Sequence, residues 1–340
     1  MELGVILPPV PRRAAYVARM VEEMGFAALL FPDSQNLAPE VWSELSLAAH
    51  ATTTLRLGPG VTNSVTRDAA VTAGAALTLQ VESQGRAVLG IGRGDSSVQR
   101  IGRREDPVAG LASYLDAVQR YLRGEAVDRD GFASRLEWLP HAKVAKVPLF
   151  VAATGRRVIE VAARCADAVC LAAGADPAHL AALLEHARGA AQAAGRAPDA
   201  VRYGAFVNCV IHADRKVARD ALRGTVATFA RFSAFRGSDL QRLPEPLRRA
   251  AEYLRTHYDM REHTRADAAH TAGIRDEFVD WFAIAGPAEV ALPRFRQLAA
   301  LGLDFCYVVP GSANISREVA TGSLVGLAQG ILPALRAAAP

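Results

Sequence analysis

Two glycine-rich loops constrain the fold of this chain more than any other feature. Each follows a short apolar stretch that is typical of a buried strand: residues 57–63 read LGPGVTN, and residues 89–95 read LGIGRGD. Glycine permits positive φ and lets a bulky planar or phosphorylated ligand approach the backbone. A helical stretch lies between the loops, and Thr66 is its expected N-cap. The pattern predicts a ligand lying across the carboxyl ends of parallel strands.

The same alternation of strand and helix runs through the whole chain. Each predicted strand is short and apolar, as expected for strands that are buried on both faces. The predicted strands are residues 3–7, 27–31, 55–60, 87–91, 148–153, 168–172, 203–211 and 304–309. This alternation predicts the α/β class and a single (β/α)8 TIM barrel over residues 1–340. An open doubly wound sheet is the alternative, but no GxGxxG motif follows the first strand.

Two segments depart from the alternation. Residues 124–139 predict an irregular or hairpin excursion. Residues 233–283 are polar, carry Arg and His, and contain two prolines and several aromatic residues. We expect them to form a helical insertion between the seventh and eighth strands. An insertion at this point lies near the C-terminal mouth of the barrel, where it is expected to act as a lid.

Composition excludes several classes of protein. The net charge is only +4 over 340 residues, and Lys and Arg form no long run, so no nucleic-acid partner is expected. Four cysteines lie in apolar runs without metal-ligand spacing, which indicates buried thiols in a reducing compartment. No apolar run reaches the roughly 20 residues that span a bilayer, and no signal peptide precedes the first strand. A cytoplasmic protein without a membrane partner is expected.

The glycine loops carry a family resemblance. At residues 58–63, at Thr66 and Arg67, and at residues 85–95 (GRAVLGIGRGD), the sequence resembles the bacterial luciferase-like superfamily. Within it, the chain is most similar to the coenzyme F420-dependent methylenetetrahydromethanopterin reductase-like branch. The resemblance covers nearly the whole chain. It implies a barrel that binds FMN or a deazaflavin at its C-terminal mouth, often as a homodimer.

The resemblance also implies the cofactor site. A non-prolyl cis peptide that bulges against the ring is expected between Gly60 and Val61; the alternative is an ordinary glycine turn. The first helical N–H groups after residue 155 favour an anion such as a phosphate. The implied cofactor-binding residues are Gly60, Val61, Thr62, Gly92, Gly94, Asp95, Thr154, Gly155 and Arg156.

Two polar residues are the candidate catalytic groups. Asp33 follows the second strand, where a carboxylate beside a flavin positions substrate or moves a proton. Asn63 is expected to hydrogen-bond the edge of the ring. The alternatives are a turn-forming Asp and an Asn bonded to the backbone. The histidines show no paired metal spacing, so no metal site is expected.

Two departures from the family pattern bear on the substrate. Ile6 stands where pterin reductases of this type tend to have an acidic residue, and Ser34 stands where sugar-phosphate dehydrogenases have a histidine. These two departures count against a pterin and against a sugar phosphate as the substrate. Tyr258, His257 and Trp281 of the insertion are candidate substrate contacts, although aromatic packing within the insertion explains them equally well.

Three functions remain open at this point. The leading hypothesis is an oxidoreductase that transfers a hydride between coenzyme F420 and a small organic substrate. The second is a two-component monooxygenase that takes reduced FMN from a separate flavin reductase. The third is a barrel that binds flavin without turnover. A homodimer is expected in each case, and only on the resemblance.

Overall fold

The molecule is built around a barrel of parallel strands. The computed structural model describes residues 1–234 and 244–337 of the chain. The barrel strands lie in the order β3-β2-β1-β12-β10-β9-β8-β5-β4, and neighbouring strands pair in parallel. Their bounds are β1 Glu2–Ile6, β2 Ala28–Phe31, β3 Arg56–Pro59, β4 Thr62–Asn63, β5 Leu89–Gly92, β8 Leu149–Ala153, β9 Ala168–Leu171, β10 Arg202–Ile211 and β12 Phe305–Val309. β3 falls within the predicted strand 55–60, and β4 lies just beyond it in the predicted glycine loop. Each of the eight predicted strands is present.

The sheet closes between β3 and the segment that enters β5. The backbone N–H of Leu57 donates to the Arg86 carbonyl at 3.1 Å, and the Val88 N–H donates to the Leu57 carbonyl at 2.9 Å. Leu57 therefore bridges Ala87 in the parallel sense. Closure removes the sheet edges and brings the carboxyl ends of all the strands to one rim. The predicted (β/α)8 barrel is confirmed.

Aromatic rings fill the barrel interior. Phe150, Phe206, Phe305 and Tyr307 form one buried cluster, with the Phe305 and Tyr307 ring centroids 4.9 Å apart. Glycine on the neighbouring strand makes room for such rings: a Cβ at Gly204 would lie 2.2 Å from the Phe305 ring. Large rings opposite glycine fill an eight-stranded barrel completely, because its interior is only as wide as packed side chains.

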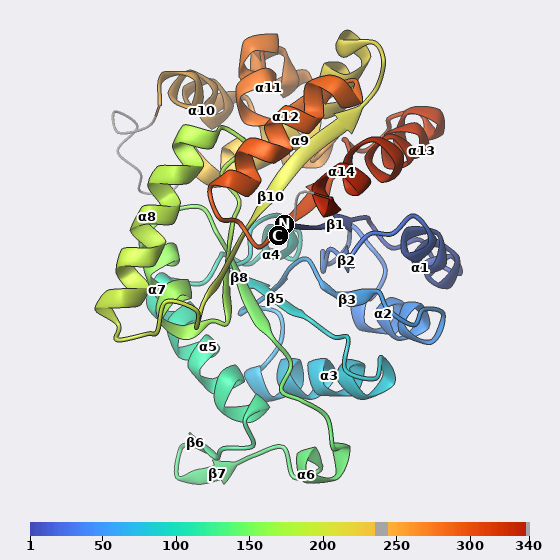
Figure 1. Ribbon diagram of the computed structural model, residues 1–340. Helices are drawn as coiled ribbons and strands as arrows, with labels where there is room; N and C mark the ends of the chain where they lie inside the picture. Colours follow the sequence, from blue (N-terminus) through green and yellow to red (C-terminus); the bar gives the residue numbers. More distant parts are fainter. Residues whose placement is uncertain (235–243, 338–340) are drawn as a thin grey trace.

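Helices form an outer layer around the strands (Figure 1). Their apolar faces and the outward faces of the strands make the main core, which is rich in Leu, Val and Ala. The outer helices are α1 Ala14–Glu23, α2 Val41–His50, α3 Ala69–Glu82, α5 Val108–Leu122, α7 Arg156–Cys165, α8 Pro177–Ala193, α9 Arg215–Ala234, α12 Ala288–Ala300, α13 Arg317–Gly326 and α14 Leu332–Arg336.

Aspartate side chains cap the starts of α3 and α8, and the cap of α3 differs from the one expected from the sequence. The N-cap of α3 is Asp68, whose carboxylate accepts from the Ala70 N–H at 2.8 Å; the expected cap, Thr66, lies in the preceding loop. Aspartate two residues later offers the same acceptor closer to the first apolar helical residue. Asp176 caps α8 as its position before proline predicts, accepting from the His179 N–H at 2.8 Å.

The two irregular segments have the predicted character. The first forms the antiparallel hairpin β6 Val127–Arg129 and β7 Phe132–Ser134, followed by the short helix α6 Leu139–Ala142. The second lies between β10 and β12 and is helical. It contains α10 Glu245–His257, the short 3-10 turns Met260–Glu262 and Ala269–Gly273, and α11 Asp276–Phe282; residues 235–243 lie outside the described residues. Two further elements were not expected: the short helix α4 Ser96–Gln99 and a strand β11 Ile284–Gly286 that pairs with β10.

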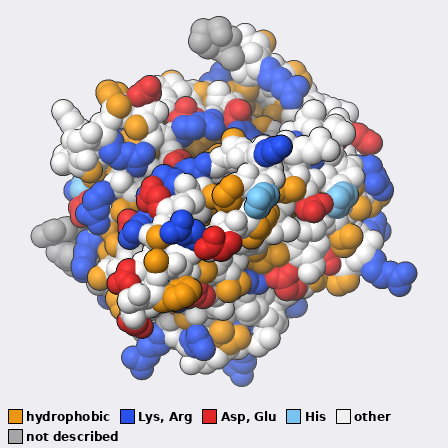
Figure 2. Space-filling model, turned by 90° about the horizontal axis from the view of Figure 1, so that it is seen from below, with side chains coloured by type: hydrophobic (Ala, Val, Ile, Leu, Met, Phe, Trp, Pro, Cys, Tyr) orange, Lys and Arg blue, Asp and Glu red, His pale blue; other side chains and the backbone are white. Residues whose placement is uncertain are grey.

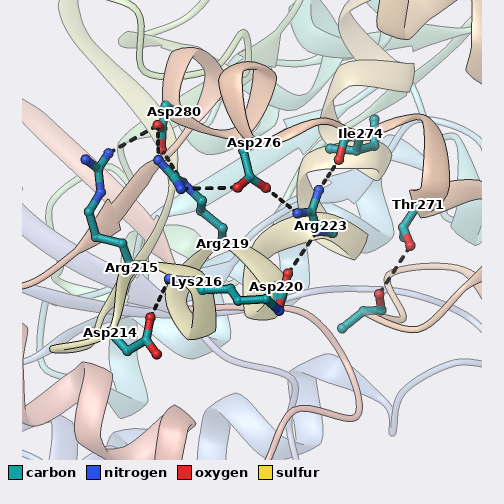
Figure 3. A network of polar contacts seen from close by, with 11 residues as sticks. Asp214, Arg215, Lys216, Arg219, Asp220, Arg223, Thr271, Ile274, Asp276 and Asp280 are labelled. Atoms are coloured by element: carbon teal, nitrogen blue, oxygen red, sulfur yellow. Dashed lines mark hydrogen bonds and ion pairs between the residues drawn. The ribbon is translucent and has the colours of Figure 1, made fainter.

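An ion-pair ladder joins the insertion to α9 (Figure 3). Arg215 and Arg219 both contact Asp280 of α11, at 3.1 and 2.9 Å. Arg219 also reaches Asp276 at 3.1 Å, and Arg223 pairs with the other oxygen of Asp276. The arginines are four residues apart on α9 and the aspartates four apart on α11, so each set lies on one helix face. The ladder fixes the position of α11 along α9.

The surface carries both signs of charge. Figure 2 shows Lys and Arg interspersed with Asp and Glu over the visible face. Among the described residues, one helical stretch, 317–336, reaches the length and mean hydropathy that crossing a membrane requires, and 33% of it is buried. Its Leu327, Ile331 and Leu332 are buried in the main core. The stretch therefore packs as an outer helix of the barrel.

We expect Arg86 to be the side chain that most strengthens the barrel closure. Its guanidinium donates to the carbonyls of Ala49, Thr52 and Leu55 at 2.6 to 2.9 Å, which joins the end of α2 to β3 and β5. Arg86→Ala leaves these acceptors unpaired and should lower the free energy of unfolding by about 3 kcal/mol.

Urea unfolding followed by circular dichroism measures this change. The matched control is Arg19→Ala, which removes an exposed arginine from α1 and should change stability by less than about 0.5 kcal/mol. Equal stability of the two variants would contradict the role of Arg86.

Candidate functional site

The predicted glycine loops meet at one side of the rim. The peptide bond between Gly60 and Val61 is cis, as the resemblance implied, and it separates β3 from β4. Gly92 lies beside it: a Cβ at Gly92 would stand 3.1 Å from the Val61 side chain. Val61 is partly exposed and packs against the interior cluster of the barrel. The bulge therefore faces the barrel mouth, with glycine leaving space next to it.

Asp33 is buried at this rim and is held by several donors. The Thr62 hydroxyl donates to its Oδ2 at 2.7 Å, and the Gln35 amide donates to its Oδ1 at 2.7 Å. Arg67 forms an ion pair with the same carboxylate and a second one with Glu40 at 2.7 Å. Burial raises the pKa of Asp33, although Thr62 and Arg67 oppose the rise. Both oxygens already accept hydrogen bonds, so this arrangement favours an anchor for the rim over a free base.

The Asn63 side chain is hydrogen-bonded to the backbone of its own loop. Its Oδ1 accepts from the N–H groups of Val65 and Thr66 at 3.0 and 2.9 Å, and its Nδ2 lies 3.5 Å from the Ser97 hydroxyl. This is the backbone-bonded alternative that the sequence left open. Asn63 shapes the loop after β4, and its contact with a ring edge stays a prediction.

The second glycine loop contains an ion pair that the sequence did not reveal. Gly94 has φ +82°, which favours glycine at this position. Asp95 accepts from Arg231 of α9 at 2.8 Å and from Gln99 at 3.0 Å. Asp95, a predicted cofactor contact, thus joins α9 to the loop after β5. Its partner lies 136 residues away, so no local pattern could identify the pair.

The loop after β8 leads into an open helix start. Gly155 is the N-cap of α7, and within the described chain a Cβ there would meet no heavy atom within 4 Å. The first N–H groups of a helix lack intrahelical acceptors and carry partial positive charge. Thr154 is partly exposed and Arg156 is exposed. This helix start can therefore receive an anion.

Several polar atoms at the mouth are buried without a partner among the described residues. Gln35 Oε1, Ser64 Oγ and Thr66 Oγ1 follow the carboxyl ends of β2 and β4. Asn208 of β10 has neither amide atom satisfied and is fully buried. Native proteins rarely leave such atoms unpaired. The sequence analysis did not identify Asn208; one polar residue within an apolar strand is the only signal.

The insertion reaches the mouth through α9. The Phe229 ring lies 6.2 Å from that of Phe206 in the barrel interior. Tyr258 hydrogen-bonds to Thr228 at 3.0 Å and to Nδ1 of His263 at 2.6 Å. Tyr258 therefore lies where the insertion meets α9. Burial, with Arg231 and Arg100 nearby, lowers the pKa of His263 to about 3.

The other two candidate substrate contacts pack against neighbouring aromatic rings, one of them on α8. His257 is exposed and stacks on Tyr253, with ring centroids 4.1 Å apart. Trp281 contacts His179 and Phe282, at 5.7 and 6.1 Å between centroids. Aromatic packing within the insertion therefore explains His257, while Trp281 packs both within the insertion and against α8.

The residues at the mouth fit a flavin or a deazaflavin. The buried Asn208 amide and the loop hydroxyls offer partners for a polar ring and its sugar-like chain, and the start of α7 suits a phosphate. Among the described residues, no group of three or more His, Cys, Asp and Glu could hold a metal ion.

Comparison with known proteins gives concordant matches. A family model described as luciferase-like monooxygenase matches residues 2–304. The 5,10-methylenetetrahydromethanopterin reductase of Archaeoglobus fulgidus is 30% identical over 302 residues, covering 87% of this chain and 88% of that protein.

Solved structures share the fold. The coenzyme F420-dependent tetrahydromethanopterin reductase of Methanopyrus kandleri aligns with a TM-score of 0.74 at 22% identity, covering 98% of this chain and 99% of that one. The monooxygenase RslO1 of Streptomyces bottropensis aligns with a TM-score of 0.70 at 21% identity, covering 98% of this chain and 100% of that one. At these identities the likeness bears on the fold.

Removing Arg67 should expose the dependence of Asp33 on its cation. Arg67→Met leaves a buried carboxylate without an ionic partner, so we expect the free energy of unfolding to fall by about 3 kcal/mol. Chemical unfolding of Arg67→Met and of the control Arg103→Met, an exposed arginine near the same loop, gives the comparison. If both variants lose the same stability, the ion pair does not anchor the rim.

His263 should make the protein sensitive to acid. A lowered pKa means that the unfolded chain binds a proton below about pH 6.5 while the folded chain does not. Stability from this group is complete above that pH and is lost as the pH falls toward 3. Between pH 7 and pH 5 the wild-type protein should lose about 2 kcal/mol relative to His263→Gln, measured by urea unfolding at each pH. If the stabilities of the two proteins change in parallel between pH 7 and pH 5, His263 is not the source of the acid sensitivity.

Proposed function

Since the chain belongs to the luciferase-like monooxygenase family, we propose that it transfers a hydride between coenzyme F420 and a small organic substrate. The chain is an oxidoreductase of this family, and its fold is that of F420-dependent reductases. The proposal extends this to the choice of cofactor and to the direction of the chemistry. A relative named as a methylenetetrahydromethanopterin reductase, matched along most of both chains, favours the deazaflavin.

The proposal rests on the polar groups at the barrel mouth that have no partner within the described chain. One end offers an open helix start at Gly155, and the floor offers an unpaired amide at Asn208. These are suited to the two ends of a cofactor with a planar polar ring and a phosphate. When bound, the deazaflavin supplies the hydride chemistry, and the protein supplies position and electrostatics.

Different residues of this chain bind the cofactor and hold the loops around it. The N–H groups at the start of α7, with Arg156, hold the phosphate. Asp33 fixes Thr62 and Arg67, and through them the segment that follows the bulge. We further propose that residues 233–283 act as a lid, because Arg231 and Tyr258 connect them to the loop after β5. The lid keeps water from the reacting atoms.

The substrate is proposed only as a small organic molecule. Ile6 lies in the apolar interior cluster, beside Leu30 and Val88, so β1 places no carboxylate at this depth. A substrate that needs an acid from the first strand is therefore disfavoured. We therefore do not propose the pterin in the name of the Archaeoglobus relative as the substrate of this chain.

The second candidate is a monooxygenase that receives reduced FMN. The likeness to the monooxygenase RslO1 favours it, since the same barrel serves both reactions. In that case a separate flavin reductase would be a partner. A homodimer and a cytoplasmic location remain predictions for either function, and a flavin-binding barrel without turnover is the third alternative.

Cofactor binding tests the proposal. We expect coenzyme F420 to quench the protein fluorescence at concentrations at least tenfold lower than FMN does, and the complex to transfer a hydride when a substrate is found. Preference for reduced FMN with oxygen consumption would favour the monooxygenase instead. Binding of either cofactor without turnover over a broad panel of substrates would favour the non-catalytic barrel.

Arg156 provides a specific variant for this assay. Arg156→Ala should weaken F420 binding about tenfold, because one charge-assisted hydrogen bond is worth about 1.5 kcal/mol. The deazaflavin core without its phosphate should bind both proteins equally. Arg157→Ala removes the adjacent exposed arginine and serves as the matched control. An equal loss of F420 affinity in the two variants would mean that the phosphate does not bind at residue 156.

A further inference from the structure

We propose that Asn208 binds the pyrimidine edge of the cofactor ring with both atoms of its side-chain amide. This inference rests on the proposed function, because it assumes that a flavin or a deazaflavin occupies the mouth. It adds a contact on the far side of the barrel from the Gly60–Val61 bulge loop. It also identifies which edge of the ring points into the barrel.

The register of β10 places Asn208 on the barrel interior. Successive residues of a strand point to opposite faces, so Asn208 shares the face of Phe206, which belongs to the interior cluster. Asn208 pairs with Val309 of β12, and Val309 packs against the same cluster. Asn208 is two residues nearer the carboxyl end of the strand than Phe206. It therefore forms part of the floor of the mouth.

The surroundings of Asn208 are apolar. Phe206, Val309 and Phe229 lie around this part of the barrel interior, and the Asn208 side chain is fully buried. Among the described residues, neither its Oδ1 nor its Nδ2 has a hydrogen-bond partner. A buried polar group left unpaired costs about 1–3 kcal/mol. The fold retains such an amide most readily if a ligand satisfies it.

The amide selects the chemistry of that ligand. Asparagine presents one acceptor and one donor side by side, so its complement carries a carbonyl next to an N–H group. The pyrimidine ring of flavins and deazaflavins has this edge, with N3–H between two carbonyl groups. A phosphate or a carboxylate offers acceptors alone and would leave Oδ1 unpaired. The bidentate geometry therefore favours the ring edge over the anionic tail of the cofactor.

A blocked ring tests the contact directly. Lumiflavin and 5-deazalumiflavin are bare rings without phosphate, and their N3-methyl derivatives lack the N3–H donor. Fluorescence titration of the wild-type protein, without substrate, should show about tenfold tighter binding of the unblocked rings. In Asn208→Leu, which has nearly the same size, the unblocked rings should bind more weakly and the preference should vanish. A substrate with a cyclic amide would offer the same edge to Asn208. The titration contains no substrate, so it reports on the cofactor ring alone.

Two controls separate the contact from a structural effect. Asn208→Leu should keep or raise the midpoint of thermal unfolding, because it removes an unpaired amide from an apolar site. Cys209→Ala alters the opposite face of the same strand and should leave the tenfold preference unchanged.

The outcomes distinguish this inference from the proposed function. Equal binding of blocked and unblocked rings by the wild-type protein would overturn the inference, even if F420 is turned over. A preference that persists in Asn208→Leu would overturn it too, and would leave buried water as the partner of the amide. A preference that depends on Asn208 supports it, even if no hydride transfer is found. Binding of none of the rings would overturn the inference, and titration with coenzyme F420 itself then decides the proposed function.

Discussion

The hydrogen bonds that close the barrel between β3 and the entry of β5 are the contacts on which the rest of the site depends. With Leu57 bonded to both Arg86 and Val88, the ring of barrel strands from β3 to β4 is closed. Closure places the ends of β2, β4, β5, β8 and β10 around one opening. Asp33, Gly92, Gly155 and Asn208 then lie at or near the carboxyl ends of their strands on one rim, although up to 175 positions separate them in the sequence.

The polar groups around that opening are of two kinds. Some satisfy each other: Asp33 with Thr62 and Arg67, and Asp95 with Arg231. These contacts hold the loops in place, and those of the buried Asp33 are the most costly to break. Others, such as the amide of Asn208, are buried and have no partner within the described chain. The first kind builds the mouth, and the second kind is available to a ligand.

Helix α9 connects the opening to the insertion. Its arginines hold α11 through Asp276 and Asp280, and its far end reaches the loop after β5 through Arg231. Phe229 of the same helix contacts the ring of Phe206 inside the barrel. The insertion is therefore tied to the rim through α9, by ion pairs to α11 along its first half and by Arg231 and Phe229 near its C-terminal end.

The sequence by itself determined the barrel, its eight strands, the hairpin at residues 124–139, the helical insertion and the family, because alternating apolar runs and glycine loops are local signals. It also indicated the bulge at Gly60–Val61. Only the tertiary structure decided what the polar residues do. Asp33 and Asn63 are occupied by neighbours, Asp95 pairs with a distant arginine, and Asn208 emerges as an unpaired amide. The reason is that burial and hydrogen bonding depend on contacts between strands and helices far apart in the chain, which no local pattern encodes.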